Sequence, residues 1–434
     1  MARTGAIYGA LYMGIISCVL ILPQSAHAAL PSLTYRYKHL LVTVAPRDMT
    51  GWQGQEEIWT YHGQPIDPPA QMRIDGDNLP PLPEGFARSL RPSWDEMAIA
   101  RTIAAKVSPV IDRTAGSVTI SRNASGSIVF EGTGFPGRLI DVGTATRVTV
   151  QALMNGVTDI TLPVTETQPA VTVNDVELRT QGIKELVTMG ESDFHGSTQN
   201  RIHNVKTGLN KFNGHVIAKD EIFSFDKVLG RVDASTGYRK ELTISGDKTL
   251  PDFGGGLCQV SSTAYRGVWE YGFPILQRKN HSFAVHYYAP QGTDATVYPP
   301  NVDIKFKNDG PAALLMQTAI DVPNTKAYFL YYGTKDDRQT QVIGPFSWGY
   351  TPAPPPRTEE TLEIPAGTKR KVGEAVPGLH AAWFRVVRKD GKEEVKSTYS
   401  IYEARPLYWQ IGVEALSSSG SLTTGEGGEA AISD

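Results

Sequence analysis

The spacing of apolar residues predicts three helices in the first half of the chain. The first begins at a capping box, Ser93-Trp94-Asp95-Glu96, and ends near Pro109. Its apolar positions are Met97, Ala100, Ile103, Ala104 and Val107. The second helix is expected around 144–155 and the third over 199–212. The third has one apolar face, made by Ile202, Val205, Leu209 and Phe212.

Strand-like alternation fills much of the remaining chain. Residues 116–122 and 126–132 flank a turn-like Asn123-Ala124-Ser125 insert, a pattern that is typical of a hairpin. Further strands are expected near 160–164, 221–225, 283–288, 302–306 and 327–332. We therefore expect a multidomain α+β protein, in which a mainly antiparallel sheet carries helices in the central part of the chain.

Changes in composition indicate the domain boundaries. Four prolines within 352–356 predict a semi-rigid linker, and the last residues are rich in Ser, Gly and Glu with few apolar side chains. The expected units are a proline- and glycine-rich region at 30–92, an α+β domain at 93–175, a central domain at 180–335, a small all-β domain at 351–413 and a disordered tail at 414–434.

The first 28 residues have the pattern of a secretory signal. Arg3 is their only charged residue, 7–22 is apolar, and Ala26-His27-Ala28 fits a small-x-small cleavage site. We therefore expect export to the periplasm, the cell wall or the extracellular face. Two alternatives stay open: lipoprotein processing at Cys18, and retention of the segment as an uncleaved membrane anchor.

Charge and cysteine content narrow the chemistry. The formal net charge is −3, and about −4 without Arg3, which argues against nucleic acid as a partner. Because Cys18 lies in the signal segment, Cys258 is the single cysteine of the expected mature chain and has no intramolecular disulfide partner. The 9 histidines include no His-Glu-x-x-His pattern, so we expect no metal and no organic cofactor.

Cys258 follows three glycines, Gly254, Gly255 and Gly256, and precedes a segment with helical apolar spacing. The pattern predicts that the cysteine lies at a helix N-terminus, where main-chain N–H groups and the helix dipole stabilise a thiolate. The N–H groups of the glycine turn and of Gln259 are expected to hold the oxyanion of a tetrahedral intermediate. The alternative is a cysteine that packs as a small apolar residue under a turn.

A thiol nucleophile needs a base, and His281 is the candidate. It lies 23 residues beyond Cys258, where we expect the start of a strand that returns to the helix. His286 is the competitor and would face the opposite side of that strand. Asn280, Asp294 and Asp303 are the candidates for a third group that orients the imidazole, and the sequence does not rank them.

These segments resemble the VanW family of bacterial cell-envelope proteins, over roughly 182–332. The residues that carry the resemblance are Phe223-Ser224-Phe225, 254–263 (GGGLCQVSST), Asn280-His281-Ser282, Asp294-Ala295-Thr296-Val297 and 303–308 (DIKFKN). The segment 93–171 is similar to the peptidoglycan-binding domain that often accompanies VanW domains. The last β unit is similar to a diverged G5 domain.

The resemblance implies an L,D-transpeptidase with a catalytic cysteine, because some family members are understood in this way. Cys258 would attack the carbonyl between the third residue and the terminal D-Ala of a peptidoglycan stem peptide, with His281 as its partner. An amine of a neighbouring stem would then take the acyl group and form a 3-3 cross-link. Two alternatives are a cysteine peptidase of stem peptides and a non-catalytic scaffold that binds cell wall or glycopeptide.

Overall fold

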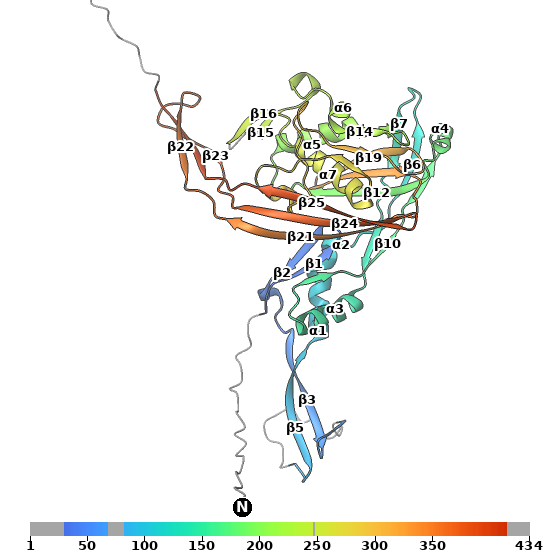
Figure 1. Ribbon diagram of the computed structural model, residues 1–434, viewed down its shortest axis with the longest axis vertical. Coiled ribbons are helices and arrows are strands. Elements are labelled where there is room, and N and C mark those ends of the chain that lie inside the picture. Colours follow the sequence, from blue (N-terminus) through green and yellow to red (C-terminus); the bar gives the residue numbers. More distant parts are fainter. Residues whose placement is uncertain (1–29, 68–81, 246–247, 415–434) are drawn as a thin grey trace, which may run out of the picture.

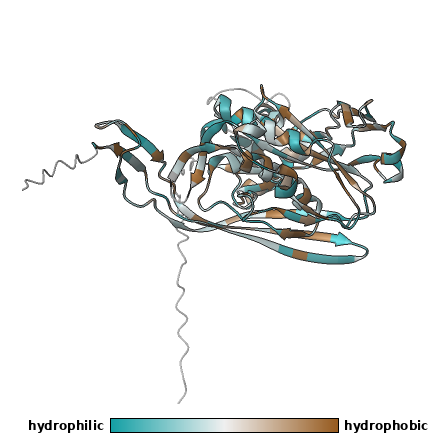
Figure 2. Cartoon of the chain, turned by 90° about the horizontal axis from the view of Figure 1, so that it is seen from above, coloured by the Kyte–Doolittle hydropathy of each residue, from teal (hydrophilic) through white to brown (hydrophobic). Residues whose placement is uncertain are grey.

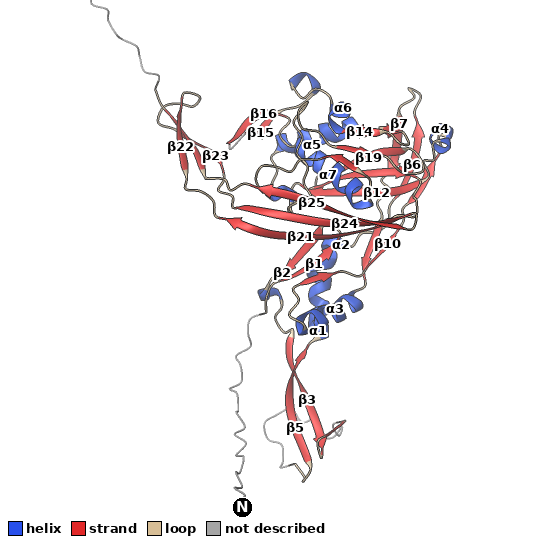
Figure 3. Cartoon of the chain, in the orientation of Figure 1, coloured by secondary structure: helices blue, strands red, loops and turns tan. Residues whose placement is uncertain are grey.

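The computed structural model describes residues 30–67, 82–245 and 248–414 (Figure 1). The expected signal segment and the tail beyond residue 414 lie outside these ranges. The protein is a multidomain α+β structure, in which most strand pairs are antiparallel. Figure 3 shows most helices in two groups, one beside β1 and one around α5 and α7, while α4 lies apart near β7. Within the described residues, no helix is both long and apolar enough to span a bilayer.

The N-terminal unit combines residues from two of the expected domains. Strand β1 (Leu33–Tyr37) pairs antiparallel with β2 (Leu40–Val44) and parallel with β9 (Asp159–Thr161). Helices α1 (Glu96–Thr102), α2 (Ser108–Ile111) and α3 (Val142–Met154) share one hydrophobic core with this sheet. The expected boundary near residue 92 therefore does not separate two cores, because residues on both sides of it bury the same apolar surface.

The first predicted helix exists, but its buried face differs from the expectation. Asp95 is the N-cap and accepts a hydrogen bond from the N–H of Ala98, while Ser93 and Trp94 end the preceding strand. A π-helical turn (Ile103–Val107) joins α1 to α2. The buried side chains follow a spacing of four and comprise Ile99, Ile103, Val107 and Ile111. Met97 is 71% exposed, because a helix that starts at Glu96 turns it away from the sheet.

Two further sheets complete this part of the chain. A hairpin sheet projects from the body (Figure 1) and consists of β3 (Gln53–Tyr61), β4 (Gln64–Ile66) and β5 (Phe86–Trp94). Strands β8 (Gly137–Ile140) and β10 (Val164–Thr167) pair antiparallel. A short 3-10 turn (Pro46–Asp48) follows β2.

The central unit has three layers. Its middle layer is a sheet with the order β12 (Glu185–Asp193), β20 (Lys326–Gly333), β19 (Leu314–Asp321) and β13 (Val216–Ile217). Both faces of β20 are buried: Phe329 and Tyr331 belong to one core, and Leu330 and Tyr332 to another. This explains the continuous apolar run that predicted a strand.

Different elements cover the two faces of the central sheet. Helices α5 (Gln199–Phe212) and α7 (Leu257–Tyr271) share the core on one side. The predicted hairpin, β6 (Ser117–Arg122) and β7 (Ile128–Gly132), pairs with β11 (Ala170–Val173) and packs on the other side together with α4 (Val176–Thr180). The expected boundary near residue 175 therefore crosses a shared core. In Figure 2, hydrophobic segments run through the middle of this body.

Shorter elements surround the helix layer. Strands β14 (Ile222–Ser224), β18 (Lys305–Lys307) and β17 (Ile275–Gln277) form a small sheet, and β15 (Lys240–Ser245) pairs with β16 (Lys248–Phe253). Helix α6 (Phe225–Leu229) follows β14, and a 3-10 turn spans Ala234–Thr236.

The prediction of a strand over 283–288 is wrong. This segment is a loop that contains a 3-10 turn (His286–Tyr288). The buried guanidinium of Arg266, on α7, donates to the carbonyl oxygens of Tyr288, Ala289 and Thr293 at 2.7, 3.1 and 3.3 Å. An arginine from the neighbouring helix thus takes up carbonyl groups that a strand would have paired along a ladder.

The C-terminal strands pack against the central unit. Strand β21 (Gln339–Thr351) precedes the proline run, yet it pairs with β24 (Gly378–Lys389), which in turn pairs with β25 (Lys392–Tyr402). The proline run therefore connects strands rather than separating a domain. Trp383 of β24 is buried in the central core and contacts Trp269 of α7 edge to face at 5.7 Å. A second sheet consists of β22 (Arg357–Thr361), β26 (Tyr408–Gly412) and β23 (Lys369–Gly373).

Helix α7 lies directly on the main chain of β12. A Cβ atom placed on Gly190 would lie 2.0 Å from the carbonyl oxygen of Thr263 and 2.7 Å from the nitrogen of Gly267. The facing Gly267 is equally crowded, with the nitrogen of Gly190 at 2.7 Å from its own Cβ position. Helix α7 and strand β12 cannot move apart without opening the core that they share. This contact therefore sets the position of α7.

We predict that Gly190→Ala lowers the free energy of unfolding by about 3 kcal/mol. The added methyl group would clash with main-chain atoms of α7, which cannot move aside as a flexible side chain could. Chemical denaturation of the purified protein measures the change. The control is Gly143→Ala in α3, where the nearest atom to the added Cβ is 3.5 Å away and a gain of about 0.5 kcal/mol is expected. Equal stability of the two variants would contradict the close contact.

Candidate functional site

Cys258 is the second residue of α7, as the glycine pattern predicted. The turn before it uses left-handed backbone conformations at Gly254 and Gly256, with φ of 82° and 113°. Gly256 is the N-cap residue and supplies no side-chain cap. The first turn of this 15-residue helix therefore contains the cysteine and has no N-cap side chain that would compete for its N–H groups.

The glycines are required by packing inside the protein. A Cβ on Gly255 would lie 2.7 Å from the carbonyl oxygen of Leu242, and one on Gly254 would lie 2.5 Å from the side chain of Val232. Asn204, fully buried on α5, donates to the carbonyl oxygens of Gly255 and Arg239 at 3.0 and 2.9 Å. The turn is thus clamped between α5 and β15, and Cys258 is held on a rigid support.

The thiol of Cys258 faces the segment that follows Asp294. A hydrogen bond of 3.4 Å joins its Sγ to Thr296 Oγ1, and the carbonyl oxygen of Val297 lies at 3.9 Å. The side chain is half-buried, and Cys258 is a free cysteine. The residue is therefore partly exposed, and its thiol is hydrogen-bonded to the segment after Asp294.

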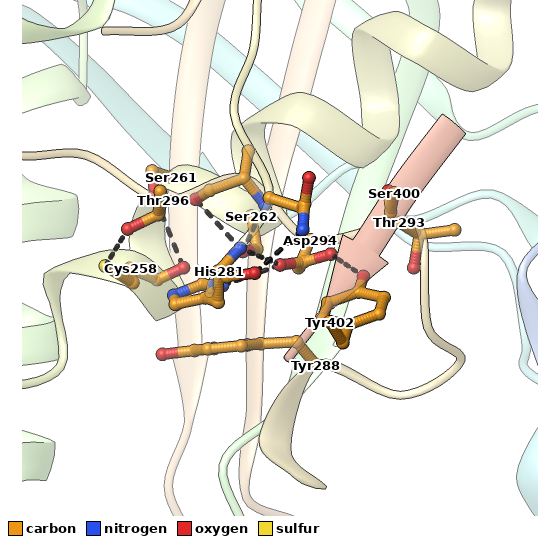
Figure 4. A network of polar contacts seen from close by, with 12 residues as sticks. Cys258, Ser261, Ser262, His281, Tyr288, Thr293, Asp294, Thr296, Ser400 and Tyr402 are labelled. Atoms are coloured by element: carbon orange, nitrogen blue, oxygen red, sulfur yellow. Dashed lines mark hydrogen bonds and ion pairs between the residues drawn. The ribbon is translucent and has the colours of Figure 1, made fainter. Parts of the chain in front are cut away.

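His281 lies between Cys258 and Asp294 (Figure 4). It is only 3% exposed, and its Nδ1 is 2.6 Å from Asp294 Oδ2, which also accepts the main-chain N–H of His281 at 2.8 Å. The ring of Tyr288 stacks on the imidazole with 4.4 Å between centroids. Because Nδ1 is bonded to the carboxylate, Nε2 is the nitrogen left for proton transfer, and it has no hydrogen-bond partner among the described residues.

The protonation states of Cys258 and His281 are coupled. Burial raises the pKa of the Cys258 thiol, but the charge of His281 and the hydrogen bond with Thr296 outweigh it and lower that pKa to about 7. Burial lowers the pKa of His281, whereas the charge of Cys258 and the bond to Asp294 raise it to about 9. The thiol thus loses its proton before the imidazolium does, and a thiolate–imidazolium pair forms near neutral pH.

Asp294 is buried and fully hydrogen-bonded. Besides His281, its Oδ1 accepts from Arg278 at 3.1 Å and from the hydroxyl of Tyr402 at 2.5 Å. Burial raises the pKa of this carboxyl, but the bond to His281 and the charges of His281 and Arg278 hold it well below its usual range. Asp294 therefore stays ionised and stabilises the imidazolium.

The loop that carries Asp294 is tied to α7. Ser261 and Ser262 donate to the carbonyl oxygen of Ala295 at 2.6 and 3.3 Å, and the N–H of Ala295 donates to Ser262 Oγ at 3.0 Å. These serines lie one turn beyond Cys258 on the same helix. The helix therefore fixes both the thiol of Cys258 and the carboxylate that contacts His281.

Comparison with known proteins identifies this part of the chain. Residues 200–329 match the family model described as VanW like protein. These residues form a VanW domain. Cys258, His281 and Asp294 all lie inside it, whereas Tyr402 lies outside. The VanW family is associated with glycopeptide resistance and the cell wall.

Two curated relatives share part of the chain. The Uncharacterized protein YoaR of Bacillus subtilis (strain 168) is 34% identical over 140 residues, which are 32% of this chain and 45% of the relative. The Vancomycin B-type resistance protein VanW of Enterococcus faecalis (strain ATCC 700802 / V583) is 28% identical over 128 residues, 28% of this chain and 46% of the relative. The chain thus spans less than half the length of these relatives. No solved structure matches it.

The structure of the VanW domain ranks the candidates for the third group. Asp294 contacts the imidazole, and Asn280 instead donates to the carbonyl oxygens of His281 and Ile401, both at 2.7 Å. Asp303 does not reach the site, because its carboxylate accepts from Ser224 Oγ at 2.7 Å and from the N–H of Asp226 at 2.9 Å.

Two other expected residues have different places in the VanW domain. His286 is exposed on the 3-10 turn. Because the strand that would have made it a competitor of His281 does not exist, His286 is no longer a candidate. The N–H of Gln259 already donates to the carbonyl oxygen of Gly256 at 2.9 Å, which removes it as an oxyanion donor. Its buried side chain donates to Ser192 Oγ at 2.7 Å and accepts from Arg201 at 3.3 Å.

The sequence interpretation missed four residues that contact the central pair or its carboxylate: Thr296, Tyr288, Arg278 and Tyr402. The first three lie within 40 residues of Cys258, in segments rich in polar and aromatic residues, but no spacing rule assigns them a role. Tyr402 left no signal in the sequence, since only the packing of β25 brings it to Asp294. Within the described ranges, no group of three or more His, Cys, Asp and Glu side chains could hold a metal ion.

Asp226 and Asp303 form a carboxylate pair away from the site. Both oxygens of Asp226 are buried without a hydrogen-bond partner in the described part of the chain. Burial and the charge of Asp303 raise the pKa of Asp226 to about 7. An unfolded Asp ionises near pH 4, so between about pH 4 and pH 7 the unfolded state gains charge that the folded state resists, and stability falls.

We therefore predict that Asp226→Asn raises the melting temperature at pH 8 and leaves it unchanged near pH 3, where the native carboxyl is protonated in both the folded and the unfolded protein. Thermal unfolding across this pH range provides the measurement. Glu131→Gln, an exposed substitution on β7, controls for the loss of one negative charge. A gain that is the same at both pH values would rule out the titration of Asp226 as the cause.

The coupled pair predicts how Cys258 reacts with iodoacetamide. The rate should rise with pH around a midpoint near 7, instead of the ~8.5 of an ordinary thiol. In His281→Gln the cationic partner is gone while burial stays, so the midpoint should move above 8.5. Mass spectrometry of the folded protein measures the labelling, and identical profiles for the two proteins would show that His281 does not activate the thiol.

Proposed function

We propose that the protein is a cell-envelope cysteine acyltransferase acting on peptidoglycan stem peptides, and that it forms 3-3 cross-links as an L,D-transpeptidase. The observation that carries the proposal is the network of Cys258, His281 and Asp294 at the N-terminus of α7. A nucleophile, a base and a group that orients the base are the parts that acyl transfer through a thioester requires.

Each residue has one task in the first half of the proposed reaction. The Cys258 thiolate attacks the carbonyl carbon between the third stem residue and the terminal D-Ala. The negative charge moves to the carbonyl oxygen, which faces the glycine turn and the positive end of α7. When the C–N bond breaks, Nε2 of the His281 imidazolium gives its proton to the leaving amine of D-Ala, and a thioester remains on Cys258.

The second half reverses these roles. The side-chain amine of a neighbouring stem attacks the thioester carbonyl, and the neutral His281 takes a proton from the attacking nitrogen. The C–S bond then breaks, the amide cross-link is complete and the thiolate–imidazolium pair is restored. Asp294 stays ionised throughout and stabilises the imidazolium, as its lowered pKa allows.

The choice of substrate rests on the family and on the resemblance of the sequence to members that are understood as transpeptidases. The printed name of the Enterococcus relative links that protein to vancomycin resistance. Residues 1–28 have the features of a signal segment, which supports export to the periplasm, the cell wall or the extracellular face. The N-terminal and C-terminal units are proposed to hold the VanW domain against the wall, and an uncleaved N-terminal segment would anchor it to the membrane.

The test is the mass of the product formed from disaccharide-tetrapeptides. We expect a dimer that lacks one D-Ala, and no product from Cys258→Ala. Monomeric tripeptide without dimer would contradict the transferase and favour a peptidase, since water would then accept the acyl group. Binding to cell-wall sacculi by both proteins without any product would instead favour a scaffold.

A further inference from the structure

The hydrogen-bond network of the site continues past the VanW domain into β25. Tyr402, the last residue of this strand, is 3% exposed. Its hydroxyl donates to Asp294 Oδ1 at 2.5 Å (Figure 4) and also accepts the N–H of Gly292 at 2.7 Å. One hydroxyl from the C-terminal sheet thus bonds both the orienting carboxylate and the main chain two residues before it.

A second residue of β25 reaches Asp294 through Arg278. Ser400 Oγ accepts from Nη1 of Arg278 at 2.8 Å. The same guanidinium donates to Asp294 Oδ1 at 3.1 Å and, through Nε, to the Asp294 carbonyl oxygen at 2.7 Å. Ser400 is 1% exposed, so water does not compete for its contact. Two side chains on one face of the strand therefore position the carboxylate from one side.

The main chain around His281 is also bonded to this end of β25. Asn280 donates to the carbonyl oxygen of Ile401 at 2.7 Å, and the N–H of Glu403 donates to the carbonyl oxygen of Ser282 at 2.7 Å. Residues immediately before and after the base are thus attached to the strand. Because the segment 280–285 has no ladder of its own, these bonds replace the support that a regular strand would give.

The C-terminal sheet is itself fixed on the helix that carries Cys258. Arg385 of β24 donates to the carbonyl oxygens of Trp269 and Phe273 at 2.8 and 3.0 Å. On β25, Thr398 accepts from the indole nitrogen of Trp269 at 3.1 Å. The sheet therefore contacts the C-terminal end of α7 while Tyr402 contacts the site at the other end. The C-terminal sheet is thus attached both to helix α7 and to the Cys258 site.

We infer that Tyr402 is a positioning residue of the Cys258 site and that the C-terminal sheet completes this site, which the matched VanW residues do not build alone. The inference deepens the proposed function and rests on it. Tyr402 acts through Asp294: its hydroxyl keeps the carboxylate against Nδ1 of His281, and the oriented imidazolium stabilises the thiolate. Burial and the charge of Asp294 raise the pKa of Tyr402 well above its ordinary value, so the hydroxyl keeps the proton that it donates.

Loss of the hydroxyl has a direct physical consequence. In Tyr402→Phe the buried N–H of Gly292 has no acceptor and Asp294 loses one of its donors, so the segment 292–294 relaxes toward other partners. The imidazolium is then held less well, and the pKa of Cys258 rises. The other groups near the pair stay in place, namely Arg278 at Asp294, and Arg201, which donates to the hydroxyl of Tyr288 at 3.3 Å.

The test is the pH profile of Cys258 alkylation by iodoacetamide in the full chain. For Tyr402→Phe we expect the midpoint to move up by about one unit, which is about a tenfold loss of rate well below the midpoint. The matched control is Tyr399→Phe on the same strand: Tyr399 is 47% exposed and bonds to His380 Nδ1 at 2.5 Å on the outer face of the sheet. Its profile should equal that of the native protein.

The outcomes separate this inference from the proposed function. A native midpoint near 8.5 would refute an activated Cys258, and with it both proposals. A native midpoint near 7 that Tyr402→Phe leaves unchanged would overturn only the role of Tyr402. If Tyr402→Phe does not fold, Ser400→Ala serves as the test, because it removes the acceptor of Arg278 and leaves the Tyr402 hydroxyl in place. A raised midpoint of Cys258 alkylation in this variant supports the inference, and an unchanged midpoint overturns it.

Discussion

The site depends on one buried carboxylate. Asp294 accepts hydrogen bonds from two nitrogens of His281, from Arg278 and from Tyr402. A buried charge is tolerated only when such donors compensate for lost solvation, and the donors here come from two parts of the chain, the segment 278–281 and the end of β25. The need to satisfy Asp294 therefore brings the base, the loop around it and the C-terminal sheet to one point.

Helix α7 positions Cys258 relative to this carboxylate. Its contact with β12 is so close that only glycine fits at position 190, and the glycine turn before Cys258 is packed against β15 and α5. Ser261, Ser262 and Arg266 on the same helix bind the loop that leads to Asp294 and away from it. The thiol and the carboxylate are thus placed by the same rigid element, which preorganises the pair for chemistry.

The electrostatics of the pair follow from this geometry. Burial alone would make both the thiolate and the imidazolium unfavourable, yet each charged form is stabilised by the other. Asp294 shifts the balance further, because an anion that stays ionised next to Nδ1 favours the charged imidazole. The proposed function needs this state near neutral pH, and the N-terminal end of α7 adds a favourable field for the thiolate and for a developing oxyanion.

Local patterns in the sequence determined a large part of this protein. Helices α3, α5 and α7 and the hairpin of β6 and β7 follow from apolar spacing, because their buried faces are periodic. The position of Cys258 at a helix N-terminus and its pairing with His281 also followed from the glycine motif and from the order of the elements.

Tertiary contacts decided the rest. The segment 283–288 has the composition of a strand but is a loop, and Arg266 binds the carbonyl oxygens of Tyr288 and Ala289 at its end. Asp294 was chosen over Asp303 and Asn280 by packing, and Tyr402 comes from a strand more than 100 residues away. Sequence spacing reports which face of an element is apolar, whereas contacts between distant elements depend on how whole layers dock. The sequence alone therefore predicted that Cys258 and His281 lie together, and only the tertiary structure decided which residues hold them.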